Sequence, residues 1–367
     1  MIDFNRIKKP AFILDESKCR ENIRRLTEKA KQASVVLRPH FKTHQSLTVG
    51  GWFRDEGINE ITVSSVTMAK HFGNNGWKNI TIAFPMNPRE INDLEQLSGI
   101  CHLNIVSPGP EHINTILPGI KFDAGCFIKI NTGNNRSGLE WDDRNAILRM
   151  ADLICRSKHL RFSGFLIHAG HTYKAHSRNE IVDIHEDTLF KVRHLREITG
   201  DYKINISTGD TPSCSIMSDF TGIDEIRPGN FVFYDLTQAE LGSCIRENIA
   251  VVLACPIVEK NYSRHELIIY GGGVHFSKET LRLKDGRIIY GEVVDLNESG
   301  WNFTGERSFV KALSQEHGII NASPELFRQV KIGDLAGIIP VHSCMTADLM
   351  REYYLTDNTI INDLSPK

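Results

Sequence analysis

The sequence lacks several features that would assign it to a specialised class of protein. No stretch approaches the apolar length that crosses a bilayer, and the amino-terminal run MIDFNRIKKPAFILDE places charges around a very short apolar segment. The formal net charge of -2 provides no basic surface for nucleic acid or for an anionic membrane. We therefore expect a soluble, cytoplasmic protein whose partner is a small molecule.

The cysteines form no recognisable framework. Eight of them lie scattered at positions 19, 101, 126, 155, 214, 244, 255 and 344, with no CxxC pair and no regular spacing. This distribution is typical of reduced thiols in an intracellular enzyme, and most of these side chains are expected in the core. Internal repeats and low-complexity segments are missing from the sequence as well.

Strands and helices alternate over the first two thirds of the chain. The pattern predicts strands at residues 34–38, 60–64, 79–84, 101–107, 126–131, 162–168, 203–207 and 223–227. It predicts helices at residues 16–33, 46–56, 66–74, 88–97, 110–117, 142–157 and 178–199, with a short turn of helix near 212–220. Eight strands interleaved with helices predict a (β/α)8 TIM-type barrel, whose functional side chains lie at the carboxyl ends of the strands.

The pattern of apolar and polar residues changes after Leu241. Apolar runs at residues 249–254, 266–270, 287–290 and 335–339 are separated by glycine and polar turns, with little helical periodicity. This is the pattern of an all-β domain. A chain of 367 residues is long enough for two domains, so we predict a barrel at residues 1–241 and a C-terminal β domain at residues 242–367.

The segment RPHFKTH at residues 38–44 holds the most informative lysine. It follows a short β-branched run that is typical of a buried strand, so Lys42 is expected where that strand ends and a loop begins. His40, His44 and the apolar run behind them can lower the pKa of an amine and favour Schiff-base chemistry. The alternative from spacing alone is a surface lysine in a basic loop.

This segment resembles the lysine motif of the family that includes D-threonine aldolase and eukaryotic-type D-serine dehydratase. These are pyridoxal-phosphate (PLP) enzymes of fold type III, with a barrel of the alanine racemase type followed by a β domain. The resemblance extends from PAFILD at residues 10–15 to the HSC segment at residues 342–344, and so over nearly the whole chain. It implies a PLP-dependent enzyme with the cofactor bound to Lys42 beside His40, and a homodimer.

Two glycine loops follow the seventh and eighth predicted strands, where barrels often bind phosphate. The loops are STGDTPS at residues 207–213 and RPGN at residues 227–230. Glycine lets the main chain approach phosphate oxygens, and a helix start adds a positive dipole. Each loop alone also fits an ordinary turn. The resemblance implies phosphate contacts from Thr208, Gly209, Thr211, Gly229 and Asn230, with Asp210 as a local cap that turns its carboxylate away.

Two further loops carry candidate side chains. The loop NTGNNRSG at residues 131–138 resembles the segment that places an arginine near the phenolic oxygen of the cofactor, which implies this role for Arg136. His168 ends the sixth predicted strand, and the hydroxyl of Tyr173 five residues later can orient substrate or cofactor. His168 is predicted as a catalytic acid or base. The alternative is a packed, hydrogen-bonded histidine, which is the more common role of a single histidine in a barrel.

A metal pair is predicted in the segment PVHSCMT at residues 340–346. In an extended segment the side chains at i and i+2 share a face, so His342 and Cys344 can converge on one ion. A buried cysteine beside a structural histidine is the plainer alternative. The resemblance favours a metal: the aldolases carry His-x-Asp with manganese or magnesium, and the D-serine dehydratases carry His-x-Cys with zinc. Imidazole with thiolate also favours zinc over harder divalent ions.

These residues together predict a lyase that acts on D-3-hydroxyamino acids. With PLP on Lys42 as catalytic base and zinc on the β-hydroxyl, the expected reaction is β-elimination from D-serine or 3-hydroxy-D-aspartate to a 2-oxo acid and ammonia. The alternatives are retro-aldol cleavage to glycine and an aldehyde, amino-acid racemisation, a non-catalytic PLP-binding protein, and a barrel that binds another phosphorylated metabolite. Cys344 in place of aspartate favours the dehydratase over the aldolase.

Overall fold

The chain folds into two compact units in a computed structural model that describes residues 2–200 and 202–367. The barrel unit comprises residues 23–229, 241–243 and 365–367. The β unit combines the chain up to Asn22 with residues 230–240 and 244–364. Among the described helices, none is both long enough and apolar enough to span a membrane.

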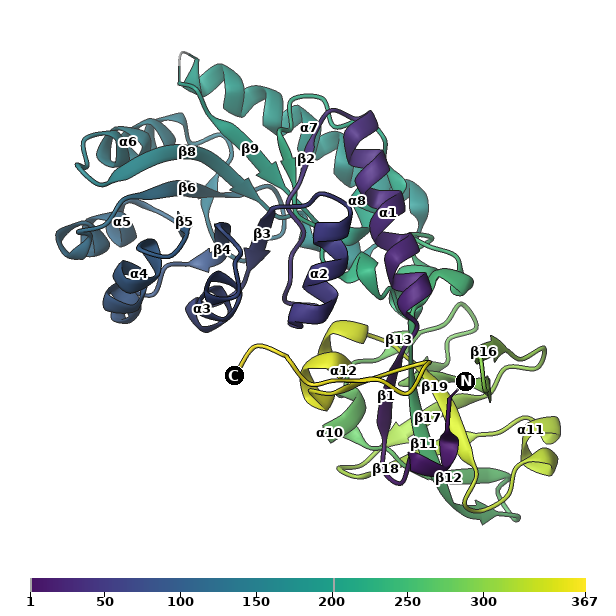
Figure 1. Cartoon of the computed structure of the whole chain (residues 1–367). Coiled ribbons are helices and arrows are strands. Elements are labelled where there is room, and N and C mark those ends of the chain that lie inside the picture. The colour runs from purple at the N-terminus through teal and green to yellow at the C-terminus, as the bar shows by residue number, and fades with distance from the viewer. Residues whose placement is uncertain (1, 201) are drawn as a thin grey trace. The chain divides into compact units, whose positions relative to one another are not determined.

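Parallel strands in the described part of the barrel unit form a closed sheet (Figure 1). They are β2 (Val36–Leu37), β3 (Glu60–Val63), β4 (Asn79–Pro85), β5 (His102–Ser107), β6 (Ala124–Asn131), β8 (Leu160–Ile167), β9 (Asn205–Thr208) and β10 (Glu225–Ile226), with β7 (Leu139–Glu140) beside β6. They are ordered β2-β10-β9-β8-β6-β5-β4-β3. A parallel bridge between His40 and Thr62 joins the two ends of this order. The predicted barrel and its eight strands are confirmed.

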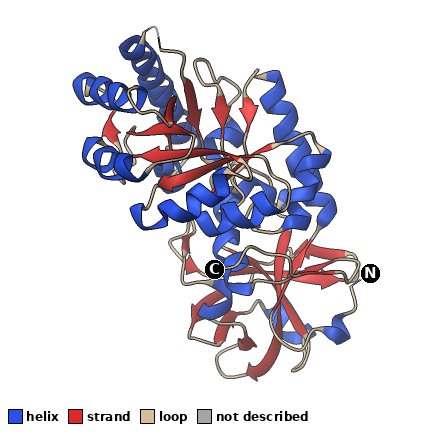
Figure 2. Cartoon of the chain, turned by 60° about the vertical axis from the view of Figure 1, so that its left-hand side comes forward, coloured by secondary structure: helices blue, strands red, loops and turns tan. Residues whose placement is uncertain are grey.

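Helices cover the outside of this sheet, as Figure 2 shows in blue around red strands. They are α1 (Glu16–Gln32), α2 (Leu47–Asp55), α3 (Val66–Asn74), α4 (Ile91–Ser98), α5 (Pro110–Ile116), α6 (Arg144–Cys155), α7 (Arg178–Thr199) and α8 (Thr211–Ile216). Serine caps begin three of them: the hydroxyls of Ser46, Ser65 and Ser177 each accept a backbone N–H three residues later. The predicted helices are confirmed, with small shifts at their ends.

The interior of the barrel changes character along the strands. Ala83, Val106, Phe127 and Leu166, from four neighbouring strands, pack into an apolar cluster. Alternate residues of a strand face the same side, so Lys129 points to the same side as Phe127, one step nearer the carboxyl end of β6. An apolar layer therefore underlies the polar side chains at the carboxyl ends of the strands.

A largely antiparallel sheet forms the centre of the β unit. Its strands are β1 (Ala11–Leu14), β11 (Val251–Asn261), β12 (Glu266–Tyr270), β15 (Gly291–Asn297), β16 (Gly300–Phe303), β17 (Phe309–Leu313), β18 (His317–Asn321), β19 (Leu335–Pro340), β20 (Tyr353–Leu355) and β21 (Ile360–Ile361). A separate hairpin joins β13 (Leu281–Arg282) to β14 (Ile288–Ile289). The predicted β character of the tail is confirmed.

Short helices interrupt this unit, so it is rich in strands without being all-β. They are α9 (Leu236–Glu240), α10 (Gly273–Phe276), α11 (Pro324–Gln329) and α12 (Ser343–Met350). The start of α11 can be recognised in the sequence, because Ser323 caps the helix and Pro324 occupies its first turn. Helix α12 carries no such cap: His342 precedes it without a side-chain capping bond.

The predicted division at residue 241 differs from the observed units at the amino terminus. Strand β1, predicted as the start of the barrel, pairs antiparallel with β11 and parallel with β20, and all four of its residues are buried. Residues 230–240 also belong to the β unit. Strand pairing across more than 200 residues leaves no local signal, so sequence periodicity could not assign these segments.

Candidate active site

The turn after β2 presents Lys42 while its neighbour anchors the chain. Phe41 is fully buried, and its ring centroid lies 5.1 Å from that of Phe53 and 5.0 Å from those of Phe72 and Trp77. Lys42 is exposed in this turn. The aromatic cluster therefore holds the backbone while the amine remains accessible at the carboxyl end of a barrel strand, where the sequence placed it.

His40 lies next to this lysine and is held as a neutral imidazole. The backbone N–H of Lys42 donates to His40 Nδ1 at 3.4 Å, which requires Nδ1 without a proton. Burial lowers the pKa of His40 well below its ordinary value, and the positive charges of Lys42 and Arg227 lower it further. His40 is therefore uncharged at neutral pH.

His168 adopts the opposite tautomer. Its Nδ1 lies 2.5 Å from the carbonyl oxygen of Gly209, and a carbonyl only accepts, so Nδ1 carries the proton. No described residue bonds its Nε2. Burial, followed by the charge of Lys129, lowers the pKa of His168 well below its ordinary value. The imidazole thus offers an oriented lone pair, as a proton acceptor requires.

The two predicted phosphate loops lie against neighbouring main chain. A Cβ on Gly209 would come within 2.8 Å of the Arg227 backbone, and one on Gly229 within 2.8 Å of the His40 carbonyl oxygen. Both glycines are therefore required by the close approach of adjacent loops. The loops after β9, β10 and β2 meet at one edge of the barrel, as predicted from their order.

Tyr173 and Asp210 organise the first turn of α8. The Tyr173 hydroxyl accepts the backbone N–H of Thr211 at 3.1 Å. Asp210 caps the helix by accepting the Ser213 N–H at 2.7 Å, and it also accepts the Thr172 hydroxyl at 3.0 Å. The prediction that Asp210 serves as a local cap is confirmed. Tyr173 stands at the phosphate loop, while the role predicted for it toward substrate stays a prediction.

An unsatisfied hydroxyl makes this turn a suitable phosphate-binding site. The side-chain oxygen of Thr211 is buried and has no hydrogen-bond partner among the described residues. Buried polar atoms normally find partners, and phosphate oxygens accept such donors. The residues present therefore fit the phosphate of PLP. The phosphate contacts predicted for Thr208 and Gly209 stay predictions.

The Asn230 side chain contacts the segment of the predicted metal pair. Its Nδ2 donates to Asp235 at 2.6 Å and to the Ser343 hydroxyl at 3.0 Å, and it lies 3.4 Å from Cys344 Sγ. All of these partners belong to the β unit. The predicted phosphate contact of Asn230, which involves its backbone, stays a prediction.

Arg136 lies in an ordered loop after β6. The carbonyl oxygen of the Asn131 side chain accepts the N–H groups of Gly133 at 3.2 Å and Asn135 at 2.9 Å, which shapes the loop. Arg136 is exposed, and its positive charge contributes to the lowered pKa values of His40 and His168. The contact of its guanidinium with the cofactor oxygen stays a prediction.

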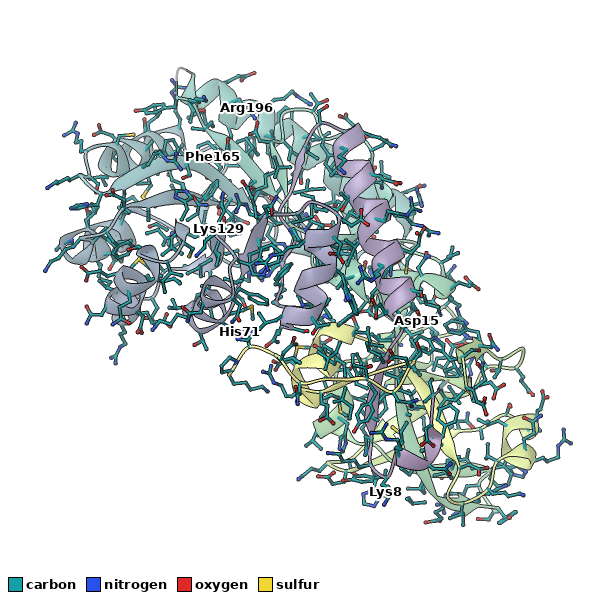
Figure 3. All side chains as sticks on the ribbon, in the orientation of Figure 1. Lys8, Asp15, His71, Lys129, Phe165 and Arg196 are labelled. Atoms are coloured by element: carbon teal, nitrogen blue, oxygen red, sulfur yellow. The ribbon has the colours of Figure 1, made fainter. Side chains whose placement is uncertain are left out.

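Two buried cations of this site were not predicted. Lys129 stands on β6 (Figure 3), and burial, with the charges of Arg227 and Arg136, lowers its pKa to about 7. Burial likewise lowers the pKa of Arg227 to about 10. A lysine inside the otherwise apolar run CFIKI was a signal in the sequence, because a strand buried on both faces rarely carries a charge.

Arg227 is held by a buried polar chain through the barrel. Its Nε donates to the Ser207 hydroxyl at 2.6 Å, which donates to Glu225 at 2.5 Å. Glu225 also accepts Arg38 Nε at 2.5 Å. These contacts hold the guanidinium in one orientation. The described carboxyl end of the barrel is thus rich in cations, which suits a ligand with phosphate and carboxylate groups.

His342 and Cys344 come together for a different reason from the one predicted. The segment is not extended throughout: His342 is the extended residue before α12, and Cys344 lies in the first turn of that helix. The two side chains are nevertheless hydrogen-bonded to each other. The i and i+2 argument was therefore wrong in geometry, while the convergence of imidazole and thiol is observed.

Two carboxylates support this pair within the β unit. His342 Nδ1 is hydrogen-bonded to Glu279. Asp235 is buried and accepts the Ser343 backbone N–H at 3.0 Å and its hydroxyl at 3.2 Å. Burial lowers the pKa of His342, but the bonds to Cys344 and Glu279 outweigh this and raise it to about 11.

The donor set fits a divalent metal with open coordination positions. Nitrogen and sulfur donors suit zinc, and two protein ligands leave places for water or substrate. Within residues 2–200 and 202–367, no three histidine, cysteine, aspartate or glutamate side chains gather so as to hold an ion alone. The pair is therefore suited to an open site and not to a closed structural one.

Comparison with known proteins places this geometry in a family. Residues 14–236 match the alanine racemase N-terminal domain, and residues 250–356 match a serine dehydratase domain. The D-serine dehydratase of Dictyostelium discoideum is 31% identical over 402 aligned residues, which cover 99% of this chain and 98% of that protein.

More distant relatives share the whole fold. The D-threo-3-hydroxyaspartate dehydratase of Delftia sp. is 27% identical over 92% of this chain and 91% of its own. Its solved structure covers 100% of this chain and 99% of its own with a TM-score of 0.90 at 24% identity, which shows the fold. A D-threonine aldolase of Arthrobacter sp. is 20% identical over 98% of this chain and 92% of its own. The chain therefore belongs to the family of D-serine dehydratases and D-threonine aldolases, whose barrel is that of the alanine racemases.

Proposed function

We propose that this protein is a PLP-dependent dehydratase of D-3-hydroxyamino acids, with D-serine or a 3-hydroxy-D-aspartate as substrate. The observation that carries the proposal is the cation-rich carboxyl end of the barrel, with an accessible Lys42 among neutral histidines. The product of β-elimination is an enamine, which water converts to a 2-oxo acid and ammonia.

The chain's own residues account for binding and proton transfer. Lys42 would hold PLP, and the hydroxyl of Thr211 would bind its phosphate. When bound, PLP supplies an electron sink for the charge that develops at the α carbon. Once the amine of the substrate has replaced it on the cofactor, the freed Lys42 amine would take the α proton. His168, with Nδ1–H donated to Gly209, would present Nε2 as a second proton acceptor.

A divalent metal, zinc in preference, is proposed on His342 and Cys344. A bound zinc ion supplies Lewis-acid polarisation of the substrate hydroxyl, which makes it a better leaving group. The imidazole and thiol in contact support this assignment. One structure of a D-threo-3-hydroxyaspartate dehydratase, a mutant in which alanine replaces a cysteine, is described as a metal-free form, which indicates that a metal belongs to that enzyme.

The second candidate is a retro-aldol cleavage to glycine and an aldehyde. It needs nearly the same site but deprotonates the hydroxyl instead of expelling it. Cys344 at the metal pair favours the dehydratase, because a thiolate selects a softer ion than the aspartate of the aldolase motif does. Racemisation has no use for a metal pair.

One assay separates these reactions. The purified protein is given PLP and zinc, then D-serine, D-threonine and the 3-hydroxy-D-aspartates, and 2-oxo acid, glycine and the L-enantiomer are measured separately. We expect 2-oxo acid and ammonia in equal amounts. Glycine without oxo acid would establish the aldolase, and a mixture of enantiomers alone would establish a racemase.

A homodimer is also proposed, because fold-type III enzymes complete their sites between subunits. Light scattering of the purified protein measures this directly. A mass twice the chain mass of 41.5 kDa is expected.

A further inference from the structure

Glu279 stands beside the predicted metal pair and has no role in the function proposed above. Its carboxylate is hydrogen-bonded to His342 Nδ1. The His342 side chain is 32% exposed and that of Glu279 46%. An exposed pair of this kind contributes little to folding stability, because water screens the charges. Folding stability therefore does not explain why these two side chains are bonded to each other.

The bond determines which nitrogen of His342 faces a metal. The bonded atoms are His342 Nδ1 and a carboxylate oxygen of Glu279, and a carboxylate oxygen accepts the hydrogen bond. His342 Nδ1 must then carry a proton. A protonated nitrogen cannot ligate, and Nε2 is left as the metal-binding atom.

The loop that carries Glu279 is attached to the helix that carries Cys344. The Thr346 hydroxyl donates to the carbonyl oxygen of Phe276 at 3.2 Å, which joins α12 to the end of α10. The Glu279 backbone N–H donates to the Ser277 hydroxyl at 3.3 Å. Phe276 is itself buried. These bonds connect the loop of Glu279 to the helix of Cys344, and the bond to His342 connects Glu279 to the other proposed ligand.

We infer that Glu279 is a positioning residue of the metal centre: it accepts Nδ1–H of His342 and so aims Nε2 at the ion that Cys344 binds. Carboxylates in this position orient metal-bound imidazoles and strengthen them as ligands. The inference rests on the proposed metal site on His342 and Cys344. It adds a residue that acts through His342 and does not itself ligate.

The test measures metal binding by the full-length protein, separately from turnover. Zn²⁺ affinity is determined by competition with a chelating dye, and Co²⁺ is added to report the thiolate-to-metal absorption. Glu279→Ala removes the acceptor, and Glu279→Gln restores an acceptor without charge. Glu316→Ala is the matched control, because Glu316 is also 46% exposed and lies 3.9 Å from His275 Nε2 in the same unit.

We expect Glu279→Ala to weaken Zn²⁺ binding about 10- to 100-fold, which is the usual effect of losing such an outer partner. Glu279→Gln should recover most of the affinity, and Glu316→Ala should match the wild type. The cobalt-thiolate absorption should persist in every variant, because Cys344 remains.

Several results would overturn the inference. Equal Zn²⁺ affinity of Glu279→Ala and wild type shows that the carboxylate does not position His342. Equal weakening by Glu316→Ala shows a general charge effect. A Glu279→Gln variant as weak as Glu279→Ala, or a changed cobalt spectrum, identifies the carboxylate as a ligand. Absence of Zn²⁺ binding by the wild type overturns the metal site and this inference together, whereas a failed elimination assay with intact binding overturns only the proposed reaction.

Discussion

Tyr173 and Thr211, 38 residues apart in the chain, meet through one hydrogen bond: the Tyr173 hydroxyl accepts the Thr211 backbone N–H at 3.1 Å. The bond connects the loop after β8 to the first turn of α8, where the buried hydroxyl of Thr211 has no partner among the described residues. Two of the predicted cofactor residues thus depend on each other.

Tyr173→Phe should therefore weaken cofactor binding and the fold together. The change leaves the Thr211 N–H without its acceptor, at a cost of about 1–3 kcal/mol if no water replaces it. Thermal unfolding without PLP measures the stability, and titration with PLP measures the affinity. Tyr262→Phe, at an exposed tyrosine, is the control and should change neither. A variant as stable as the wild type would show that water satisfies the Thr211 amide.

Lys42→Ala should abolish the cofactor absorbance near the blue edge of the visible spectrum. No other amine is proposed to form the covalent link, so activity should vanish while the fold remains. Absorbance after removal of unbound PLP measures this, and circular dichroism checks the fold. Lys203→Ala, at another exposed lysine of the barrel unit, should bind PLP like the wild type. Retained absorbance in Lys42→Ala would show that another amine binds the cofactor, and Lys129 would be the first candidate.

Lys129→Met should stabilise the cofactor-free protein, most of all at low pH. The folded pKa of Lys129, about 7, lies below its ordinary value of 10.5, so between these two values the unfolded amine binds a proton that the folded amine does not. Wild-type stability therefore rises with pH across this window. Below it the full cost of the buried charge applies, several kcal/mol at about 1.4 kcal/mol per pKa unit.

The measurement for Lys129 is urea unfolding of both proteins at the two ends of that window. The advantage of Lys129→Met should be largest near pH 7 and should shrink toward pH 10. An advantage independent of pH would show that the amine is not desolvated as described.

His168→Asn should reduce the turnover number about 10²- to 10⁴-fold, the usual contribution of a positioned acid or base, with little loss of stability. Asparagine can still donate to the Gly209 carbonyl but offers no Nε2 lone pair. The matched control is His185→Asn, because His185 is a buried histidine whose Nε2 lies 2.7 Å from the Asp219 carbonyl oxygen. That variant should lose stability and keep its turnover number. The reverse pattern would make His168 a structural residue.

Cys344→Asp should shift the metal preference from zinc toward manganese or magnesium. Replacing a soft thiolate by a hard carboxylate changes the donor set while His342 and Glu279 remain in place. Affinities for Zn²⁺ and Mn²⁺, each measured by competition, give the ratio. Glycine and 2-oxo acid measured on the same variant show whether the ligand also decides between cleavage and elimination. An unchanged ratio would show that Cys344 does not bind the metal.

The sequence alone determined the barrel and the positions of its functional loops. Eight β-branched or apolar runs at regular intervals can bury their side chains only in a covered parallel sheet, and strand order then brings Lys42, His168 and Gly209 to one edge. The resemblance carried by His342 and Cys344 likewise predicted a metal pair, which stays a prediction.

Only the tertiary structure decided how these residues are held. Strand β1 joins β11 and β20, Asn230 turns to Asp235, and Glu279 reaches His342 across 63 residues. Such contacts depend on long-range pairing and packing, which leave no period in the sequence. The tautomers of His40 and His168 and the lowered pKa of Lys129 follow from burial and from neighbours that meet only in the folded chain.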